Sequence, residues 1–410
     1  MRLAVENLEA SKIREVANAG MGRADVLAFW FGESDEVTPE PVRRAAIASI
    51  ERGETFYAHN LGLPELRAAI AAYASALHGP VDAGRIAVTS GGVNALMIAM
   101  QTLLDAGDEA VAVTPVWPNL TAQPAVLGAR VRCVPLRAEQ GAWTLDLQAL
   151  LDAITLATRL LIVNAPNNPT GWTLTREEQQ AILAHCRRTG TWILSDEVYE
   201  HLYYEADASP APGRPKAGAP LRGEGMSPSG GAEFSCAPSF LDIAAPDDRL
   251  IVAQSFSKSF LMTGWRLGWL VLPPALVDGV GKLIEFNTSC ASVFTQRAGL
   301  AALEHAAEIT PPLVAHLRRC RDTLLPQLAA LPQVEVASPR GGMYAFFRLH
   351  GFGDSLDVAQ RLVAEAGLGL APGNAFAPEA QGWLRWCFAS RDAARLEAGV
   401  QWLRDWLSKQ

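Results

Sequence analysis

SFSKSFLMTGWRLG, residues 255–268, is the stretch on which the fold assignment rests. It continues LIVAQS (250–255), a short apolar run of the kind that forms a buried strand. A lysine is most often a solvated surface charge, but small and apolar residues flank Lys258, so we expect it to be only partly exposed. Desolvation lowers the pKa of an amine toward the reactive neutral form. Arg266 suits either a structural ion pair or an immobile phosphate.

Further short apolar runs alternate with helical patterns before this segment. Two helical patterns cover residues 92–104 and 175–188, and the second begins with TREE, in which Thr175 and Glu178 form a capping-box signature. Strands that alternate with helices predict a mostly parallel sheet covered on both faces, and thus an α/β fold. The predicted strands are IAVT (86–89), AVAV (110–113), RLLIV (159–163), TWILS (191–195) and LIVAQS (250–255).

The two ends of the chain show a different pattern from its middle. Residues 1–40 predict one short helix and a loop, whereas residues 305–410 mix amphipathic helices with short strands such as YAFFRL. We expect these ends to form one smaller α+β domain, and residues 41–304 to form a large α/β domain. Within the latter, residues 206–238 contain 23 Gly, Pro, Ser or Ala residues among 33. This composition has no periodicity and predicts a loop insertion.

Composition and charge exclude several classes of protein. The formal net charge is −8 at pH 7, so the field of the protein would repel nucleic acids and anionic lipids. The six cysteines are scattered and show no metal-ligand spacing, which predicts reduced thiols and no metal site. The start of the chain lacks the apolar core of a signal peptide, and no apolar run approaches the roughly 20 residues needed to cross a bilayer. We therefore expect a cytoplasmic protein without nucleic-acid or membrane partners.

Three further motifs follow or end predicted strands. SDEVY (195–199) ends the TWILS run, and because ligands of open α/β sheets gather at the carboxyl ends of strands, Asp196 and Tyr199 should face a cleft. Taken alone, an acidic pair at such a position is more often a helix cap or a surface charge. NAPNNPTG (164–171) predicts a rigid turn. TSGGVNAL (89–96) places two glycines where a strand ends and a helix begins, and the N–H groups of a helix N-terminus bind phosphate.

Together these motifs resemble those of the class I and II aminotransferases, aspartate aminotransferase-like members of the fold-type I enzymes that use pyridoxal 5′-phosphate (PLP). The resemblance covers nearly the whole chain. It implies a mostly parallel seven-stranded sheet in the large domain, a PLP cofactor, and a homodimer with composite active sites. It also implies transfer of an amino group from an amino acid to a 2-oxo acid by a ping-pong mechanism. Further segments occur in the family's order, namely GESD (32–35), TFYAHNLG (55–62), GDEAVAV (107–113) and RWCFASR (385–391).

Matched motif by motif, the resemblance assigns roles around the cofactor ring. It implies that Lys258 carries PLP as a Schiff base, the internal aldimine, and later moves the proton of the substrate. Asp196 would pair with the pyridine nitrogen, while Tyr199 and Asn168 would form hydrogen bonds to the phenolic oxygen. Trp117 would stack on the ring, at a position where this branch of the family commonly has tyrosine or phenylalanine.

The resemblance also assigns the groups that hold the substrate and the phosphate. Arg385 would grip the substrate α-carboxylate in a bidentate fork, next to Asn168 and a backbone N–H of Gly32. From the residues alone, an arginine in WLRW is expected at the surface. Tyr57 would reach the phosphate bound by the neighbouring subunit. The chain's own phosphate site would consist of Ser255, Arg266 and the N–H groups near Gly91 and Gly92.

Two other functions stay open at this point. A PLP-dependent carbon–sulfur β-lyase would use the same lysine and the same grip on the carboxylate, because a fold does not determine a reaction. A non-catalytic regulator that senses an effector would need a DNA-binding extension. The sequence does not identify the amino donor, and no basic residue in a recognisable position indicates a donor with an acidic side chain.

Overall fold

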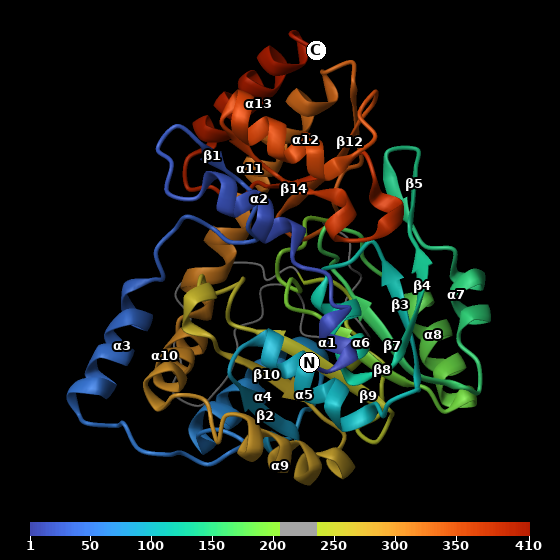
Figure 1. The fold of residues 1–410 in the computed structure, drawn as a ribbon. Coiled ribbons are helices and arrows are strands. Elements are labelled where there is room, and N and C mark those ends of the chain that lie inside the picture. The colour runs from blue at the N-terminus through green and yellow to red at the C-terminus, as the bar shows by residue number, and fades with distance from the viewer. Residues whose placement is uncertain (206–235) are drawn as a thin grey trace.

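A seven-stranded sheet forms the centre of the computed structural model, which describes residues 1–205 and 236–410 (Figure 1). Its strand order is β2-β10-β9-β8-β7-β3-β4, and β10 is antiparallel to both neighbours while the other pairs are parallel. The expected α/β fold with a mostly parallel seven-stranded sheet is confirmed, and every predicted run forms one of its strands. These strands are β2 (Ile86–Thr89), β3 (Glu109–Thr114), β4 (Arg130–Pro135), β7 (Thr158–Asn164), β8 (Trp192–Asp196), β9 (Leu250–Ser255) and β10 (Gly268–Val271).

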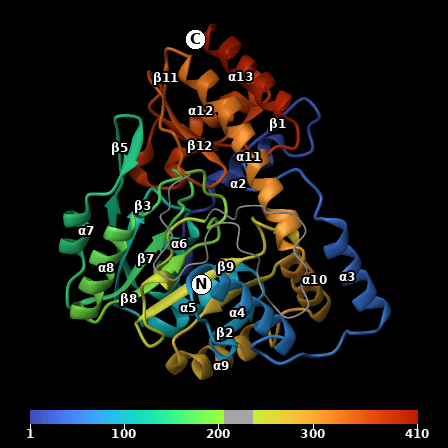
Figure 2. The same ribbon diagram turned by 180° about the vertical axis from the view of Figure 1, so that it is seen from behind.

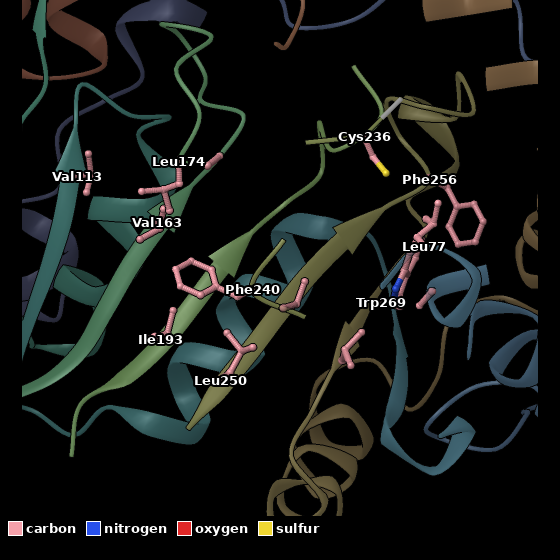
Figure 3. Close-up of a cluster of buried hydrophobic side chains, with 14 of the residues drawn as sticks. Leu77, Val113, Val163, Leu174, Ile193, Cys236, Phe240, Leu250, Phe256 and Trp269 are labelled. Carbon is pink, nitrogen blue, oxygen red and sulfur yellow. The ribbon is translucent and has the colours of Figure 1, made fainter. Parts of the chain in front are cut away.

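Both faces of this sheet are buried except at the edge strand β4, which explains why the other six strands are mostly continuous apolar runs. Successive side chains along a strand point to opposite faces. In β2, Ile86 and Val88 belong to one hydrophobic cluster and Ala87 to another, and in β3 Val111 and Ala112 divide in the same way. Figure 3 shows side chains of the first cluster on neighbouring strands of the sheet.

Helices complete the two clusters. α4 and α8 contribute to the first cluster, and α5 and α9 to the second. α8 begins with the predicted capping box: the Glu178 amide donates to the Thr175 hydroxyl, and the Thr175 amide donates to the Glu178 carboxylate at 2.7 Å. The helices of this part are α3 (Glu40–Glu51), α4 (Pro64–His78), α5 (Gly92–Leu103), α6 (Asn119–Leu127), α7 (Leu147–Ala153), α8 (Arg176–Thr189), α9 (Val277–Asn287) and α10 (Val293–Glu304).

The N-terminal elements α2 and β1 lie beside a second sheet, which is antiparallel and has the order β11-β12-β15-β14, whereas the N-terminus itself lies against α6 (Figures 1 and 2). The short strand β1 pairs in parallel with β13, and α2 packs against β13 and β14. None of the described helices is both long and apolar enough to cross a membrane. The elements of this part are α2 (Lys12–Gly20), β1 (Leu27–Ala28), α11 (Ala306–Ala329), β11 (Val334–Val336), β12 (Tyr344–Leu349), α12 (Ser355–Arg361), β13 (Leu368–Gly369), β14 (Ala371–Pro372), β15 (Trp383–Cys387) and α13 (Ala393–Leu407).

The N-terminal residues differ from the expected single short helix and loop. Two helices, α1 (Leu3–Glu6) and α2, precede β1. The reason is length: α1 is a single turn and β1 has two residues, so neither shows a period in the sequence. The predicted insertion at 206–238 lies outside the described residues except for its last three. The domain boundaries at residues 40 and 304 stay a prediction.

A buried network of charged side chains lies behind the carboxyl end of β8. His78, the last residue of α4, contacts two carboxylates: its Nδ1 is 2.7 Å from Asp242, and its Nε2 contacts Glu200. Arg176, at the start of α8, pairs with the other oxygen of Asp242, which ends the short helix η2 (Phe240–Asp242). The network therefore joins α4, α8 and η2 to the segment that follows β8.

The contacts of His78 define its charge. Both ring nitrogens face carboxylates, which only accept hydrogen bonds when ionised, so the geometry fits the imidazolium form. Burial alone would lower the pKa of His78, but Glu200 and Asp242 outweigh burial and raise the pKa to about 10. Burial would raise the pKa of Asp242, yet its contacts with His78 and Arg176 lower it to about 2. The network is therefore charged at neutral pH.

We expect the His78→Gln variant to unfold at a lower temperature than the wild type, because losing one partner of a buried ion pair costs about 3 to 5 kcal/mol. The folded-state pKa of His78 is raised from 6.5 to about 10. Its stabilisation is thus complete below pH 6.5 and is lost as the pH rises through about 10. Thermal unfolding of both proteins over this pH range measures the difference, which should shrink toward alkaline pH.

Arg187→Gln is the control, since it removes an exposed ion pair with Asp248 and should cost about 1 kcal/mol or less. A difference between wild type and His78→Gln that stays constant with pH would contradict the ionised network.

Candidate active site

A cavity of about 390 Å³ opens where the carboxyl ends of β7, β8 and β9 approach the second sheet. Asn164, Asp196 and Ser255 end these strands and line the cavity, and Tyr344 and Arg385 reach it from β12 and β15. The lining includes most of the residues that the sequence singles out, namely Gly32, Gly92, Trp117, Asn168, Asp196, Tyr199, Ser255, Lys258, Arg266 and Arg385.

Lys258 is half-buried in the turn after β9. Its ammonium donates a hydrogen bond to the carbonyl oxygen of Gly32 and lies 5.8 Å from the centre of the Tyr199 ring. Burial lowers the pKa of Lys258 to about 8. A substantial fraction of this amine is therefore neutral near physiological pH, which makes it available as a nucleophile or base.

Asp196 ends β8 and is 2% exposed. Within the described residues its carboxyl group accepts one hydrogen bond, a long one of 3.4 Å from the backbone N–H of Val198. Burial raises the pKa of Asp196 to about 7, although Val198 and the charge of Lys258 act in the opposite direction. A buried carboxyl group in this state gains from a positively charged or N–H partner placed in the cavity.

Several hydrogen-bond donors lie together at one end of the cavity. Ser255 ends β9 and its hydroxyl lies 2.9 Å from that of Ser257, while Gly92 begins α5. Arg266 crosses close to Gly91, where a Cβ would collide with the guanidinium, and Gly91 has a φ of 96°, so both space and backbone favour glycine. Hydroxyls, a guanidinium and a helix N-terminus together suit a phosphate group.

Arg385 forms the opposite end of the cavity. It lies on the central part of β15 and is 2% exposed, which corrects the surface position expected from the residues alone. Its guanidinium donates to Asn168 at 3.0 Å and to the carbonyl of Trp30, and it lies between the rings of Tyr344 and Phe376, 4.5 and 4.9 Å from their centres. Its buried Nε has no hydrogen-bond partner in the described chain, and Nη1 and Nη2 each use one of their two N–H groups in these bonds, so donors remain for a carboxylate bound in the cavity.

Two tyrosine hydroxyls lie near Asn168 and Arg385. Asn168 donates to the Tyr199 hydroxyl at 3.4 Å, and the Tyr199 and Tyr344 hydroxyls are 2.7 Å apart. Sequence reasoning did not single out Tyr344. Its position at the start of the YAFFRL strand, directly after two glycines and a methionine, was the available signal, but the strand pattern does not reveal that this strand borders the cavity.

Other residues of the cavity were missed for different reasons. Asn164 and Ser257 lie inside motifs already quoted, NAPNNPTG and SFSK, so their position at a strand end was a usable signal. Arg14 lines the cavity from α2, with its guanidinium 4.7 Å from the centre of the Phe31 ring, and no motif marks it. Tyr57, in contrast, is 88% exposed and does not line the cavity of its own chain.

Known proteins share both the sequence and the fold of this chain. The family model for aminotransferase class I and II matches residues 25–403. An aspartate aminotransferase of Pyrococcus horikoshii is 30% identical over 95% of this chain and 93% of its own length. An arginine–pyruvate transaminase of Pseudomonas aeruginosa is 32% identical over 91% of this chain and 87% of its own.

A solved structure gives the same result. An aspartate aminotransferase of Thermus thermophilus, a single mutant, superposes with a TM-score of 0.85 at 29% sequence identity, and the match covers 99% of both chains. The family match spans most of the chain and agrees with the seven-stranded sheet. The chain therefore belongs to the class I and II aminotransferase family and is an enzyme of amino-group transfer.

Proposed function

We propose that this chain binds PLP through Lys258 and transfers an amino group from an amino acid to a 2-oxo acid in two half-reactions. The observation that carries the proposal is a single cavity in which a lysine of lowered pKa, a buried carboxyl group, a donor-rich end and a buried arginine meet. Small-molecule substrates fit a cavity of about 390 Å³.

The residues present fit the cofactor. Ser255, Arg266 and the N–H of Gly92 would hold its phosphate, and Trp117 would stack on its ring. Asp196 would accept the pyridine N–H, which supplies the partner that this buried carboxyl group lacks. When bound, the pyridinium ring delocalises the electron pair left at the substrate Cα after deprotonation.

The chain's own groups account for the remaining steps. Arg385 would bind the substrate α-carboxylate with the remaining N–H groups of Nη1 and Nη2 and so orient the Cα–H bond toward Lys258. Lys258, as a neutral amine, would take the proton from the substrate Cα and deliver it to the C4′ carbon of the cofactor. The hydroxyl of Tyr199 and the amide of Asn168 would donate toward the phenolic oxygen of the cofactor, which tunes its acidity.

A carbon–sulfur β-lyase would use the same groups for Cα deprotonation, but the relatives named above are transaminases. The two reactions differ in their need for an acceptor, since a lyase releases ammonia and pyruvate without one. Arg14 is a cation available to an acidic donor side chain, so aspartate and glutamate belong among the donors to test.

Purified protein assayed with a panel of amino acids should form more than one equivalent of 2-oxo acid product per active site only when 2-oxoglutarate or pyruvate is supplied as acceptor. Borohydride reduction followed by peptide mass spectrometry should place the trapped cofactor on Lys258, because this amine is buried beside the donor-rich end. Lys258→Ala should lose both trapping and turnover. A trapped adduct on another lysine, or acceptor-independent release of ammonia, would overturn the proposal.

Arg385→Lys is expected to lower kcat/KM for the best donor, since an ammonium cannot replace a bidentate guanidinium. The decrease should correspond to a loss of roughly 2 to 5 kcal/mol of transition-state binding free energy. Steady-state kinetics with the donor varied provide the measurement. Arg395→Lys is the matched control, because Arg395, which lies on α13, pairs with Asp35 and does not line the cavity. Near wild-type kcat/KM in Arg385→Lys would rule out the assigned role.

We further propose a homodimer in which Tyr57 completes the phosphate site of the partner. Large apolar side chains are exposed on α3 and on the loop after it: Ile50 is 52%, Phe56 84% and Tyr57 88% exposed. Asn60 in the same loop donates to the Gly281 carbonyl of α9 at 2.9 Å, and α9 exposes Phe286 at 90%. Such a group of exposed apolar side chains marks an interface in a soluble protein.

Sedimentation at assay concentration should therefore show a dimer. Ile50→Asp should favour the monomer and weaken cofactor retention, whereas Tyr57→Phe should weaken cofactor retention with the dimer intact. Leu156→Asp, at a residue 84% exposed in the loop between α7 and β7, is the control and should change neither property. An active wild-type monomer would contradict the composite site.

A further inference from the structure

Tyr344, the first residue of β12, places its hydroxyl 2.7 Å from the hydroxyl of Tyr199. Both side chains are buried, with exposures of 0% and 3%, and both line the cavity. Within the described residues, Tyr199 is the only hydrogen-bond partner of the Tyr344 hydroxyl. Burial raises the pKa of both phenols, so both are protonated at neutral pH.

The direction of this hydrogen bond follows from counting donors and acceptors. A tyrosine hydroxyl has one proton to donate and two lone pairs that accept. Within the described residues the Tyr344 proton has one acceptor, the Tyr199 oxygen, which also accepts from Asn168 at 3.4 Å. With both lone pairs of Tyr199 occupied, its own proton is left to point into the cavity.

The ring of Tyr344 makes a second contact with the site. The Arg385 guanidinium lies 4.5 Å from the ring centre, and a Cβ at Gly32 would collide with the Tyr344 hydroxyl, so Gly32 leaves the space that this hydroxyl occupies. Arg385 also donates to Asn168 at 3.0 Å. Tyr199, Tyr344, Arg385 and Asn168 therefore form a closed ring of contacts.

We infer that Tyr344 is a positioning residue whose hydroxyl donates to Tyr199 and so directs the Tyr199 proton toward the cofactor. This inference rests on the proposed function, because it takes PLP as the group that receives the Tyr199 hydrogen bond. A hydroxyl that accepts a hydrogen bond becomes a stronger donor, since chains of hydrogen bonds polarise one another. Tyr344 would thus strengthen the bond that stabilises negative charge on the phenolic oxygen of the cofactor.

Tyr344→Phe removes this hydroxyl and keeps the ring beside Arg385. We expect the pH midpoint of the absorption change of the bound cofactor, titrated without substrate, to rise by about 0.3 to 1 pH unit. The sign follows because a weaker hydrogen bond to the phenolic oxygen favours the protonated form of the chromophore. KM for the amino donor should change less than about threefold, since the Arg385 contact is retained.

Tyr204→Phe is the matched control. The Tyr204 hydroxyl is buried and donates to the Gly342 carbonyl at 2.6 Å, two residues before Tyr344, but Tyr204 does not line the cavity. Its removal costs a buried hydrogen bond of the same kind and should leave the midpoint unchanged. An equal shift in Tyr204→Phe and Tyr344→Phe would assign the effect to general loosening and overturn the inference.

A double variant keeps the test decisive. In a Tyr199→Phe background, the additional Tyr344→Phe change should shift the midpoint no further, because the hydroxyl through which Tyr344 acts is absent. Additive shifts, or no shift in Tyr344→Phe with the cofactor bound, would refute the inference. Failure of the wild-type protein to bind PLP at Lys258 would instead refute the proposed function, so the two failures are distinguishable.

Discussion

The site depends on one constraint, a carboxyl group held out of water at the end of a buried strand. Asp196 is 2% exposed, and its carboxyl group receives one hydrogen bond from the described chain, at 3.4 Å. A group in this position costs free energy unless a partner meets it, so it persists only where the surrounding structure prevents it from turning toward water. Here β8 fixes it from one side, through pairing with β7 and β9. The segment after it is fixed by the charged network, in which Glu200 contacts His78.

The side chains of that segment lie in two environments, the cavity and the buried network. In DEVYEH (196–201), Asp196 and Tyr199 line the cavity, whereas Glu197 and Glu200 are buried behind it. Glu197 accepts hydrogen bonds from Ser195 and Ser239 at 2.7 and 2.6 Å, and Glu200 accepts one from Gln254 at 2.9 Å. Side chains that do not line the cavity therefore support the segment whose Asp196, Val198 and Tyr199 face it. A rigid supporting layer of this kind is what keeps reactive groups within a few tenths of an ångström of a working geometry.

The fold could be predicted from the sequence because strands buried on both faces are continuous apolar runs, and polar motifs at their carboxyl ends mark one edge of the sheet. All five predicted strands and the capping box of α8 are present. Tertiary register was not predictable: Arg385 is buried because β15 pairs with both β12 and β14, and neither pairing is visible in WLRW. The roles of Tyr344 and His78 could not be predicted for the same reason, because their partners Tyr199 and Glu200 lie more than a hundred residues away in the chain.

The cavity divides into a centre and a rim with different consequences for chemistry. Lys258, Asp196, Arg266 and Arg385 form a centre whose charges suit a phosphate, a ring nitrogen and an α-carboxylate, features that every α-amino acid reaction on such a cofactor shares. The rim is contributed by other parts of the chain, with Arg14 and Phe31 near the N-terminus and Trp117 before α6. Relatives at about 30% identity bear names as different as aspartate and arginine–pyruvate transaminase, so membership of the family does not identify the donor. Under the proposed function, discrimination between donor side chains falls to the rim, where Arg14 is the one cation among the described lining residues outside the centre. Arg14 is contributed by the N-terminal helix α2, whereas Lys258 follows strand β9 of the large sheet.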